Sequence, residues 1–108
     1  MEDTLKELYK IVESRKGQHI EGSYTCYLFE KGLDKILKKV GEESTEVVIA
    51  AKNLSNSDLA EEIADLTYHL TVLCVERGLS IEAVQNVLHE RTKKLGNLKK
   101  FHHVDKNS

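Results

Sequence analysis

Apolar residues recur every three to four positions through most of this 108-residue chain, and this spacing constrains its fold more than any other feature. A helix of 3.6 residues per turn places such positions on one face, which can pack against neighbouring helices. No alternating apolar and polar stretch of useful length appears, and the chain contains no proline. The pattern therefore predicts an all-α fold.

Glycines and helix-capping serines divide the pattern into four to five predicted helices. We expect helices at residues 3–15, 23–31 and 33–54, a fourth that starts at the N-cap Ser57 and stops at Gly78, and a last one from the cap Ser80 to about Leu95. Short turns between long helices are typical of an antiparallel bundle. Residues 1–95 form the predicted domain, and residues 96–108 a polar tail to which we assign no function.

Composition narrows the classes of partner. The formal net charge is −2, no basic stripe appears, and no run approaches the length of a membrane span, so we expect no nucleic-acid or membrane binding. The first twenty residues lack the apolar core of a signal peptide. Cys26 and Cys74 form no close-spaced motif, which fits packing roles in a reducing cytoplasm.

Two acidic pairs at i,i+3 spacing interrupt the apolar pattern. The first pair is Glu43 and Glu46, and Glu43 takes a position that core packing would normally give to Leu or Val. The predicted stripe around it is Ile36, Val40, Glu43, Val47, Ala50 and Leu54. Glu46 lies to one side of this stripe.

The second pair, Glu62 and Asp65, continues to His69 along the flank of the next helix. The predicted apolar stripe of that helix is Leu59, Ile63, Leu66, Leu70 and Leu73. Carboxylates beside buried faces are costly unless a cation meets them. All-oxygen ligands from Glu43, Glu46, Glu62 and Asp65 favour Mg²⁺, with Mn²⁺ as the alternative, over zinc. The competing interpretation is a set of acids on solvated helix surfaces.

Phosphate chemistry is the natural partner of a carboxylate-held Mg²⁺. Lys35 and Lys39 lie at i,i+4 on the flank that also carries Glu42 and Glu46, where they could bind a polyphosphate. An ordinary ladder of helix salt bridges would explain the same residues. Ser23, Tyr24 and Thr25 follow Gly22 and could donate to a phosphate, although Ser and Thr are also common helix caps.

Two further expectations concern residues beside the predicted site. His69 could orient a metal ligand from the second shell or act as a general base, and the alternative is a structural histidine. Tyr68 is expected to pack. Val72, Cys74 and Val75 lie off the predicted apolar stripe, so we expect a homodimer to cover them.

Several stretches of the chain resemble the phosphoribosyl-ATP pyrophosphohydrolases of histidine biosynthesis. They are GSYT at residues 22–25, LFEKGLDKI at 28–36, KKVGEE at 38–43 with Glu46, VIAAK at 48–52, EIADL at 62–66 with Tyr68 and His69, and RGL at 77–79. The spacing of the acids is similar to the E-x-x-E and E-x-x-D pattern of the wider all-α nucleoside triphosphate pyrophosphatases.

The resemblance implies hydrolysis of phosphoribosyl-ATP to phosphoribosyl-AMP and pyrophosphate, dependence on Mg²⁺, and a helical homodimer. It assigns metal binding to Glu43, Glu46, Glu62 and Asp65, with Glu42 close by. Lys35 and Lys39 would then stabilise developing charge, and the catalytic base would be Glu42 or Glu46.

Three alternatives remain open from the residues themselves. A related all-α pyrophosphatase could act on free nucleotides such as dCTP or dUTP. A di-iron bundle would need Glu-x-x-His pairs, which the chain does not offer at these acids. A non-catalytic helical interaction module would tolerate Glu43→Gln and Glu62→Gln.

Overall fold

The computed structural model describes residues 4–96 as five helices joined by short turns, without a strand in that range. They are α1 (Thr4–Arg15), α2 (Tyr24–Lys31), α3 (Leu33–Lys52), α4 (Asn56–Arg77) and α5 (Ile81–Gly96). The all-α prediction is confirmed. The predicted tail, residues 96–108, lies outside the described residues except for Gly96, which ends α5.

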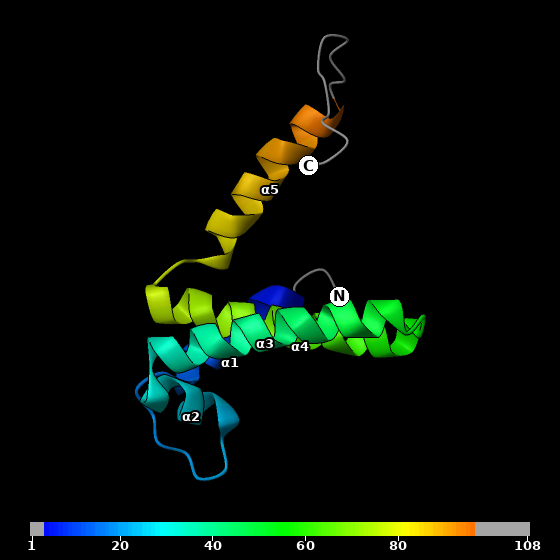
Figure 1. Cartoon of the computed structure of the whole chain (residues 1–108). Coiled ribbons are helices and arrows are strands. Elements are labelled where there is room, and N and C mark those ends of the chain that lie inside the picture. The colour runs from blue at the N-terminus through cyan, green and yellow to red at the C-terminus, as the bar shows by residue number, and fades with distance from the viewer. Residues whose placement is uncertain (1–3, 97–108) are drawn as a thin grey trace.

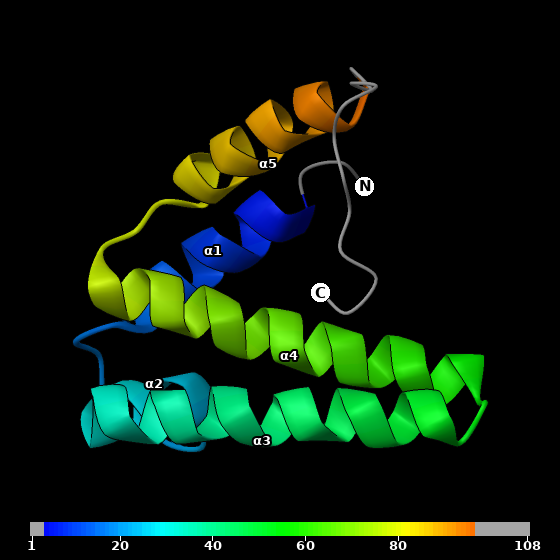
Figure 2. The same cartoon turned by 45° about the horizontal axis from the view of Figure 1, so that its top comes forward.

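The two longest helices, α3 and α4, form an antiparallel hairpin that is the frame of the molecule (Figures 1 and 2). Helix α1 packs against α4, and α2 packs against α3. Helix α5 contacts α1, and in Figure 1 it points away from α3 and α4. The predicted bundle is therefore formed by α1 to α4, and α5 is not a member of it within one chain.

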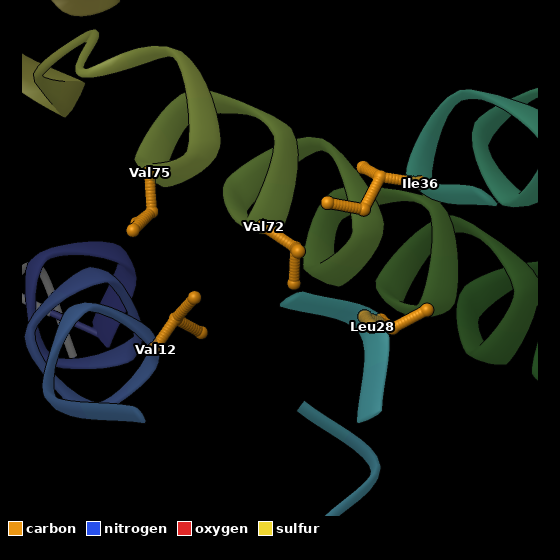
Figure 3. Packing of buried hydrophobic residues seen from close by; sticks show 5 residues of the cluster. All are labelled: Val12, Leu28, Ile36, Val72 and Val75. Atoms are coloured by element: carbon orange, nitrogen blue, oxygen red, sulfur yellow. The ribbon is translucent and has the colours of Figure 1, made fainter. Parts of the chain in front are cut away.

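The core lies where α1, α2, α3 and α4 meet. Figure 3 shows its five buried members, Val12, Leu28, Ile36, Val72 and Val75. Each removes apolar surface from water, worth about 1.5–3 kcal/mol for a fully buried side chain of this size. This core fixes α3 and α4 in the register that brings their acids together.

The buried face of α4 differs from the predicted stripe. Ile63 and Leu70 are exposed, whereas Val72 and Val75, which we expected to need a second chain, lie in the core. Helix α4 carries apolar residues around its circumference, so spacing alone allowed two faces, and the positions of α1 and α3 select between them. On α3, Leu54 is also not part of the stripe, because it lies in the turn after the helix and is 89% exposed.

Local caps explain where the helices begin and end. The hydroxyl of Ser55, not of the predicted Ser57, accepts the backbone N–H of Asp58 and caps α4. Gly78 ends α4 in the left-handed conformation with φ of 69°, and Ser80 accepts the Ala83 N–H at the start of α5, both as predicted. Gly32 ends α2 with its N–H on the Leu28 carbonyl.

None of the helices in residues 4–96 combines the length and apolar character that crossing a bilayer requires. Cys26 and Cys74 are free thiols. Partial burial raises the pKa of the Cys74 thiol, which disfavours the nucleophilic thiolate and fits the predicted packing role.

Candidate metal centre

Three of the four predicted metal ligands meet across the α3–α4 hairpin. Glu43 of α3 and Glu62 and Asp65 of α4 each offer a carboxylate oxygen, and these atoms lie within 4.8 Å of one another. Glu43 and Glu62 are half-buried, and Asp65 is exposed. Three hard oxygen donors on two rigid helices fit Mg²⁺ or Mn²⁺, which prefer oxygen ligands and keep some coordinating water.

The electrostatics of this acidic cluster, Glu43, Glu62 and Asp65, call for a cation. Desolvation, followed by the negative charge of Asp65 and then of Glu46, Glu43 and Glu61, raises the pKa of the Glu62 carboxyl. Like charges and burial both disfavour the ionised form. A divalent cation at the cluster would favour the ionised form again, so the arrangement is suited to binding one.

Glu46, the fourth predicted ligand, is not one of the three acids that meet. Its side chain is exposed, one helical turn beyond Glu43, although its charge contributes to the raised pKa of Glu62. Its predicted part in metal binding stays a prediction. An exposed carboxylate beside the cluster is also free to take a proton from water.

Lys39 links the acidic cluster to the positive edge of α3. Its Nζ lies 3.7 Å from Oε1 of Glu43 and 3.4 Å from Oε1 of Glu42. Partial burial lowers the pKa of the Lys39 ammonium, but the phenol oxygen of Tyr24 and the carboxylates of Glu42 and Glu43 outweigh that effect and raise it. Lys39 is therefore a firmly charged group at the edge of the cluster.

Lys35 is placed differently from Lys39. Its Nζ lies 5.9 Å from the ring centroid of Tyr27, a cation–π distance. The alternative salt-bridge ladder is thus formed by Lys39 with Glu42 and Glu43. A phosphate chain on this edge would meet two lysines one turn apart on α3.

His69, which we predicted on the flank of α4, is buried, with 5% of its surface exposed. Its Nδ1 is 2.8 Å from the backbone carbonyl oxygen of Asp65. A carbonyl only accepts, so Nδ1 carries the proton and donates. In the neutral ring, Nε2 then accepts from the hydroxyl of Tyr24 at 3.1 Å. A chain of hydrogen bonds therefore runs from α2 through His69 to the backbone of a cluster acid.

The other two predicted phosphate ligands of α2 have partners of their own. The Ser23 hydroxyl accepts the Cys26 N–H at 3.1 Å and caps the helix. The hydroxyls of Thr25 and Tyr68 are hydrogen-bonded to each other, and burial raises the pKa of the Tyr68 phenol. These hydroxyls can still accept or donate further bonds. Their predicted contact with a phosphate stays a prediction.

Sequence reasoning missed that Tyr68 and Tyr27 belong to an aromatic group around Tyr24. The rings of Tyr24 and Tyr27 have centroids 6.0 Å apart at 25° to each other, and Tyr68 and His69 approach edge to face with centroids 4.9 Å apart. Tyr24 and Tyr27 are one turn apart on α2, so their i,i+3 spacing was the available signal.

The amino-acid sequence matches one family of known proteins. The profile of the phosphoribosyl-ATP pyrophosphohydrolase family matches residues 5–92. A phosphoribosyl-ATP pyrophosphatase of Clostridium novyi is 54% identical over 97 residues, covering 90% of this chain and 88% of the relative. One of Listeria welshimeri is 55% identical over 101 residues, covering 94% and 97%. One of Listeria innocua is 60% identical over 91 residues, covering 84% and 87%.

Proposed function

The chain belongs to the phosphoribosyl-ATP pyrophosphohydrolase family, and we propose that its reaction takes place at the cluster of Glu43, Glu62 and Asp65. It is an enzyme of histidine biosynthesis that hydrolyses phosphoribosyl-ATP to phosphoribosyl-AMP and pyrophosphate. The observation that carries the proposed site is the approach of the three carboxylate oxygens to within 4.8 Å.

Glu43, Glu62 and Asp65 would hold Mg²⁺, or Mn²⁺ in its place, with Glu46 as a further ligand. When bound, the ion neutralises charge on the triphosphate and polarises its phosphorus–oxygen bonds. The raised pKa of Glu62 supports this assignment, because a carboxylate that is hard to ionise alone is ionised readily beside a cation.

The lysines and hydroxyls along α2 and α3 would hold the substrate's phosphates. Lys39 is charged and close to the cluster, and Lys35 lies one turn before it. The hydroxyls of Ser23, Tyr24 and Thr25, at the start of α2, would be further donors to the phosphates. Together these groups would align the triphosphate so that water reaches the α-phosphorus in line with the departing pyrophosphate.

The general base would be Glu42 or Glu46, whichever carboxylate is not fully used by the metal. Both carboxylates lie outside the group of three acids that meet, and both are exposed to water. In the reaction a water molecule gives one proton to this carboxylate while its oxygen bonds to the α-phosphorus. The bond from the α-phosphorus to the bridging oxygen breaks, and pyrophosphate leaves with the electron pair.

His69 and Tyr24 would keep the α4 acids in place. The Tyr24 hydroxyl and the His69 ring connect α2 to the backbone of Asp65. Because the imidazole meets a carbonyl and not a carboxylate, its role is to orient the helix turn that carries the ligand.

A homodimer is the expected assembly, and the cytoplasm is the expected compartment. Val87 and Leu88 of α5 are more than half exposed, as is Val48 of α3, and nothing in the described part of one chain covers them. Apolar residues left exposed on helices that diverge from the core favour a second copy as cover. The two free thiols fit a reducing compartment.

The direct test is release of pyrophosphate from phosphoribosyl-ATP with and without Mg²⁺. We expect release only with the ion, and a loss of about 100-fold or more in kcat for Glu43→Gln and for Glu62→Gln. Glu7→Gln, which removes an exposed acid from α1, is the matched control and should retain activity. Full activity in Glu62→Gln would move the reaction away from the cluster, and a strong preference for free triphosphates would contradict the substrate.

A further inference from the structure

Lys35 differs from Lys39 in having no carboxylate beside it. Lys39 contacts two carboxylates, those of Glu42 and Glu43. None of the ion pairs within residues 4–96 includes Lys35, although its side chain is half-buried. A long, flexible side chain loses rotamer entropy when a ligand fixes it, so a lysine that is already held in place binds phosphate more tightly. The group that holds Lys35 therefore bears on the reaction.

The ring of Tyr27 takes the place of a carboxylate. The Nζ of Lys35 lies 5.9 Å from the ring centroid, within the range of a cation–π interaction. In one continuous helix, two residues eight positions apart would lie about 12 Å apart along the axis. Gly32 interrupts the helix between them, with φ of 93°, a conformation that disfavours residues with a Cβ. This break lets α2 pack against α3 and brings the ring to the lysine.

Neighbouring aromatic rings hold Tyr27 in turn. Tyr24, one turn earlier on α2, stacks on the Tyr27 ring with centroids 6.0 Å apart and 25° between the ring planes. The hydroxyl of Tyr24 is bonded to the buried ring of His69 at 3.1 Å. A series of contacts therefore leads from α4, the helix that carries two of the three cluster acids, to Lys35.

An aromatic ring can hold a lysine without neutralising it. The ring attracts the ammonium through its quadrupole but has no net charge, so Lys35 keeps its full positive charge toward an anion. A phosphate at Lys39 has to share that ammonium with Glu42 and Glu43. At the edge of α3 formed by the two lysines, the larger part of the attraction for a triphosphate then comes from Lys35.

We propose that Tyr27 is a positioning residue for the reaction, whose ring holds the ammonium of Lys35 where the triphosphate of the substrate binds. The ring itself does not contact the reacting atoms. This inference rests on the proposed function, because it assigns how one of the phosphate-binding lysines is held.

Lys31 provides an internal comparison, because its Nζ lies 5.8 Å from the centroid of the same ring. Lys31 is the exposed last residue of α2, four positions after Tyr27 on the same helix. Lys35 is half-buried on α3, one turn before Lys39. The ring should therefore affect the reaction through Lys35 and not through Lys31.

Two substitutions of Tyr27 separate the aromatic face from the rest of the side chain. Tyr27→Leu removes the ring, and we expect kcat/KM for phosphoribosyl-ATP to fall about tenfold. Tyr27→Phe keeps a ring face for the ammonium and should stay within about twofold of the unmodified enzyme. Equal losses in the two variants, or no loss in Tyr27→Leu, would overturn the inference.

A double-mutant cycle distinguishes positioning of Lys35 from a general effect on the fold. Once Lys35→Met has removed the ammonium, adding Tyr27→Leu should lower kcat/KM by less than about twofold. In the matched Lys31→Met background, Tyr27→Leu should still cause the loss of about tenfold. A structural role for the ring would give the same loss in every background. Disappearance of the effect in Lys31→Met would assign the ring to the wrong lysine.

Binding of α,β-methylene-ATP with Mg²⁺ tests the same contact without turnover, because the bond to be cleaved is blocked. Calorimetric titration should give a Kd about tenfold higher for Tyr27→Leu and within about twofold for Tyr27→Phe. An unchanged Kd in Tyr27→Leu, or no binding to the unmodified protein, would overturn the inference.

The two experiments also separate this inference from the proposed function. If the unmodified enzyme hydrolyses phosphoribosyl-ATP and Tyr27→Leu keeps its kcat/KM, the role of Tyr27 fails and the function stands. If the unmodified enzyme does not hydrolyse phosphoribosyl-ATP, the function fails, and the titration with α,β-methylene-ATP still decides whether the Tyr27 ring holds a lysine that binds triphosphate.

Discussion

The hydroxyl of Tyr24 lies 3.1 Å from Nε2 of His69, so that a residue of the second helix is bonded to a buried ring of the fourth. The other ring nitrogen of His69 meets the carbonyl of Asp65, one turn earlier on α4. Both nitrogens of a buried imidazole are thereby satisfied, and the turn of α4 that carries Asp65 is tied to α2.

Removing this hydroxyl should destabilise the protein. In Tyr24→Phe the buried Nε2 of His69 loses its partner, which costs about 1–2 kcal/mol in the free energy of unfolding. Urea denaturation followed by circular dichroism measures the change. Tyr9→Phe is the matched control, because its hydroxyl donates to the Leu79 carbonyl at an exposed position and should cost about 0.5 kcal/mol. Equal losses in the two variants would contradict a special role for the His69 contact.

Glu62→Gln should raise the stability of the metal-free protein while removing activity. Desolvation and the neighbouring acids raise the Glu62 pKa, so the folded protein holds that proton more tightly than the unfolded chain. In the absence of metal, the contribution of this group to stability is thus larger below the raised pKa and decreases as pH rises through it. A neutral glutamine mimics the protonated form at every pH. Thermal melts at neutral pH in EDTA check this, with Glu7→Gln as control, and a lower melting temperature for Glu62→Gln would contradict it.

With Mg²⁺ bound, the unmodified protein should be more stable than Glu62→Gln. The ion binds the folded cluster, and at 100 times its Kd it would add about 2.7 kcal/mol to the free energy of unfolding. Protons compete with the ion for Glu62, so the stabilisation by Mg²⁺ should shrink as pH falls toward the raised pKa. The measurement is the difference in melting temperature with and without Mg²⁺ across a pH series. A shift of the same size in Glu43→Gln would place the bound ion elsewhere.

The acidic pairs show how far the sequence could carry the site. Helical spacing and the cost of burying charge predicted one site for Glu43, Glu46, Glu62 and Asp65, and the hairpin brings three of these four acids together. The burial of His69 was not predictable in the same way. It depends on the side chain of Tyr24 in α2 reaching His69 in α4, and a contact between residues 45 positions apart leaves no periodic signal in either helix.

Helix α4 shows where pattern reading fails. Its apolar residues surround the axis, so Ile63 and Leu70 fitted a stripe as well as Val72 and Val75 did. Helix α1 determines which face of α4 is buried, because its Val12 packs in the core cluster with Val72 and Val75. Only the tertiary arrangement contains that information, whereas the caps at Gly78 and Ser80 are local and were predicted correctly.

The cap of α4 offers a local test of the structure against the sequence pattern. Ser55 accepts the Asp58 N–H, so Ser55→Ala should cost about 1 kcal/mol in the free energy of unfolding. Ser57→Ala should change it by less than about 0.5 kcal/mol, because that residue lies inside the helix and is exposed. Chemical denaturation of both variants decides between the two serines, and a larger loss for Ser57→Ala would restore the cap first expected from the sequence.

The exposed apolar residues of α5 are the main reason to expect a homodimer. Its first residue, Ile81, is buried, but Val87 is 52% and Leu88 58% exposed, and Figure 1 shows the helix extending away from α3 and α4. A homodimer that covers this face should dissociate when a charge is placed on it, because an ionised side chain in an apolar contact is costly.

Leu88→Glu should therefore halve the mass measured by light scattering at micromolar concentration, from that of a dimer to that of one chain. Asn86→Glu adds the same charge two residues away on the exposed polar side of α5 and should leave the dimer intact. Circular dichroism of both variants shows whether the helices persist. A single-chain mass for the unmodified protein would contradict the homodimer, and a dimer that survives Leu88→Glu would place the contact on the exposed face of α3 and α4, where Val48 and Ile63 lie.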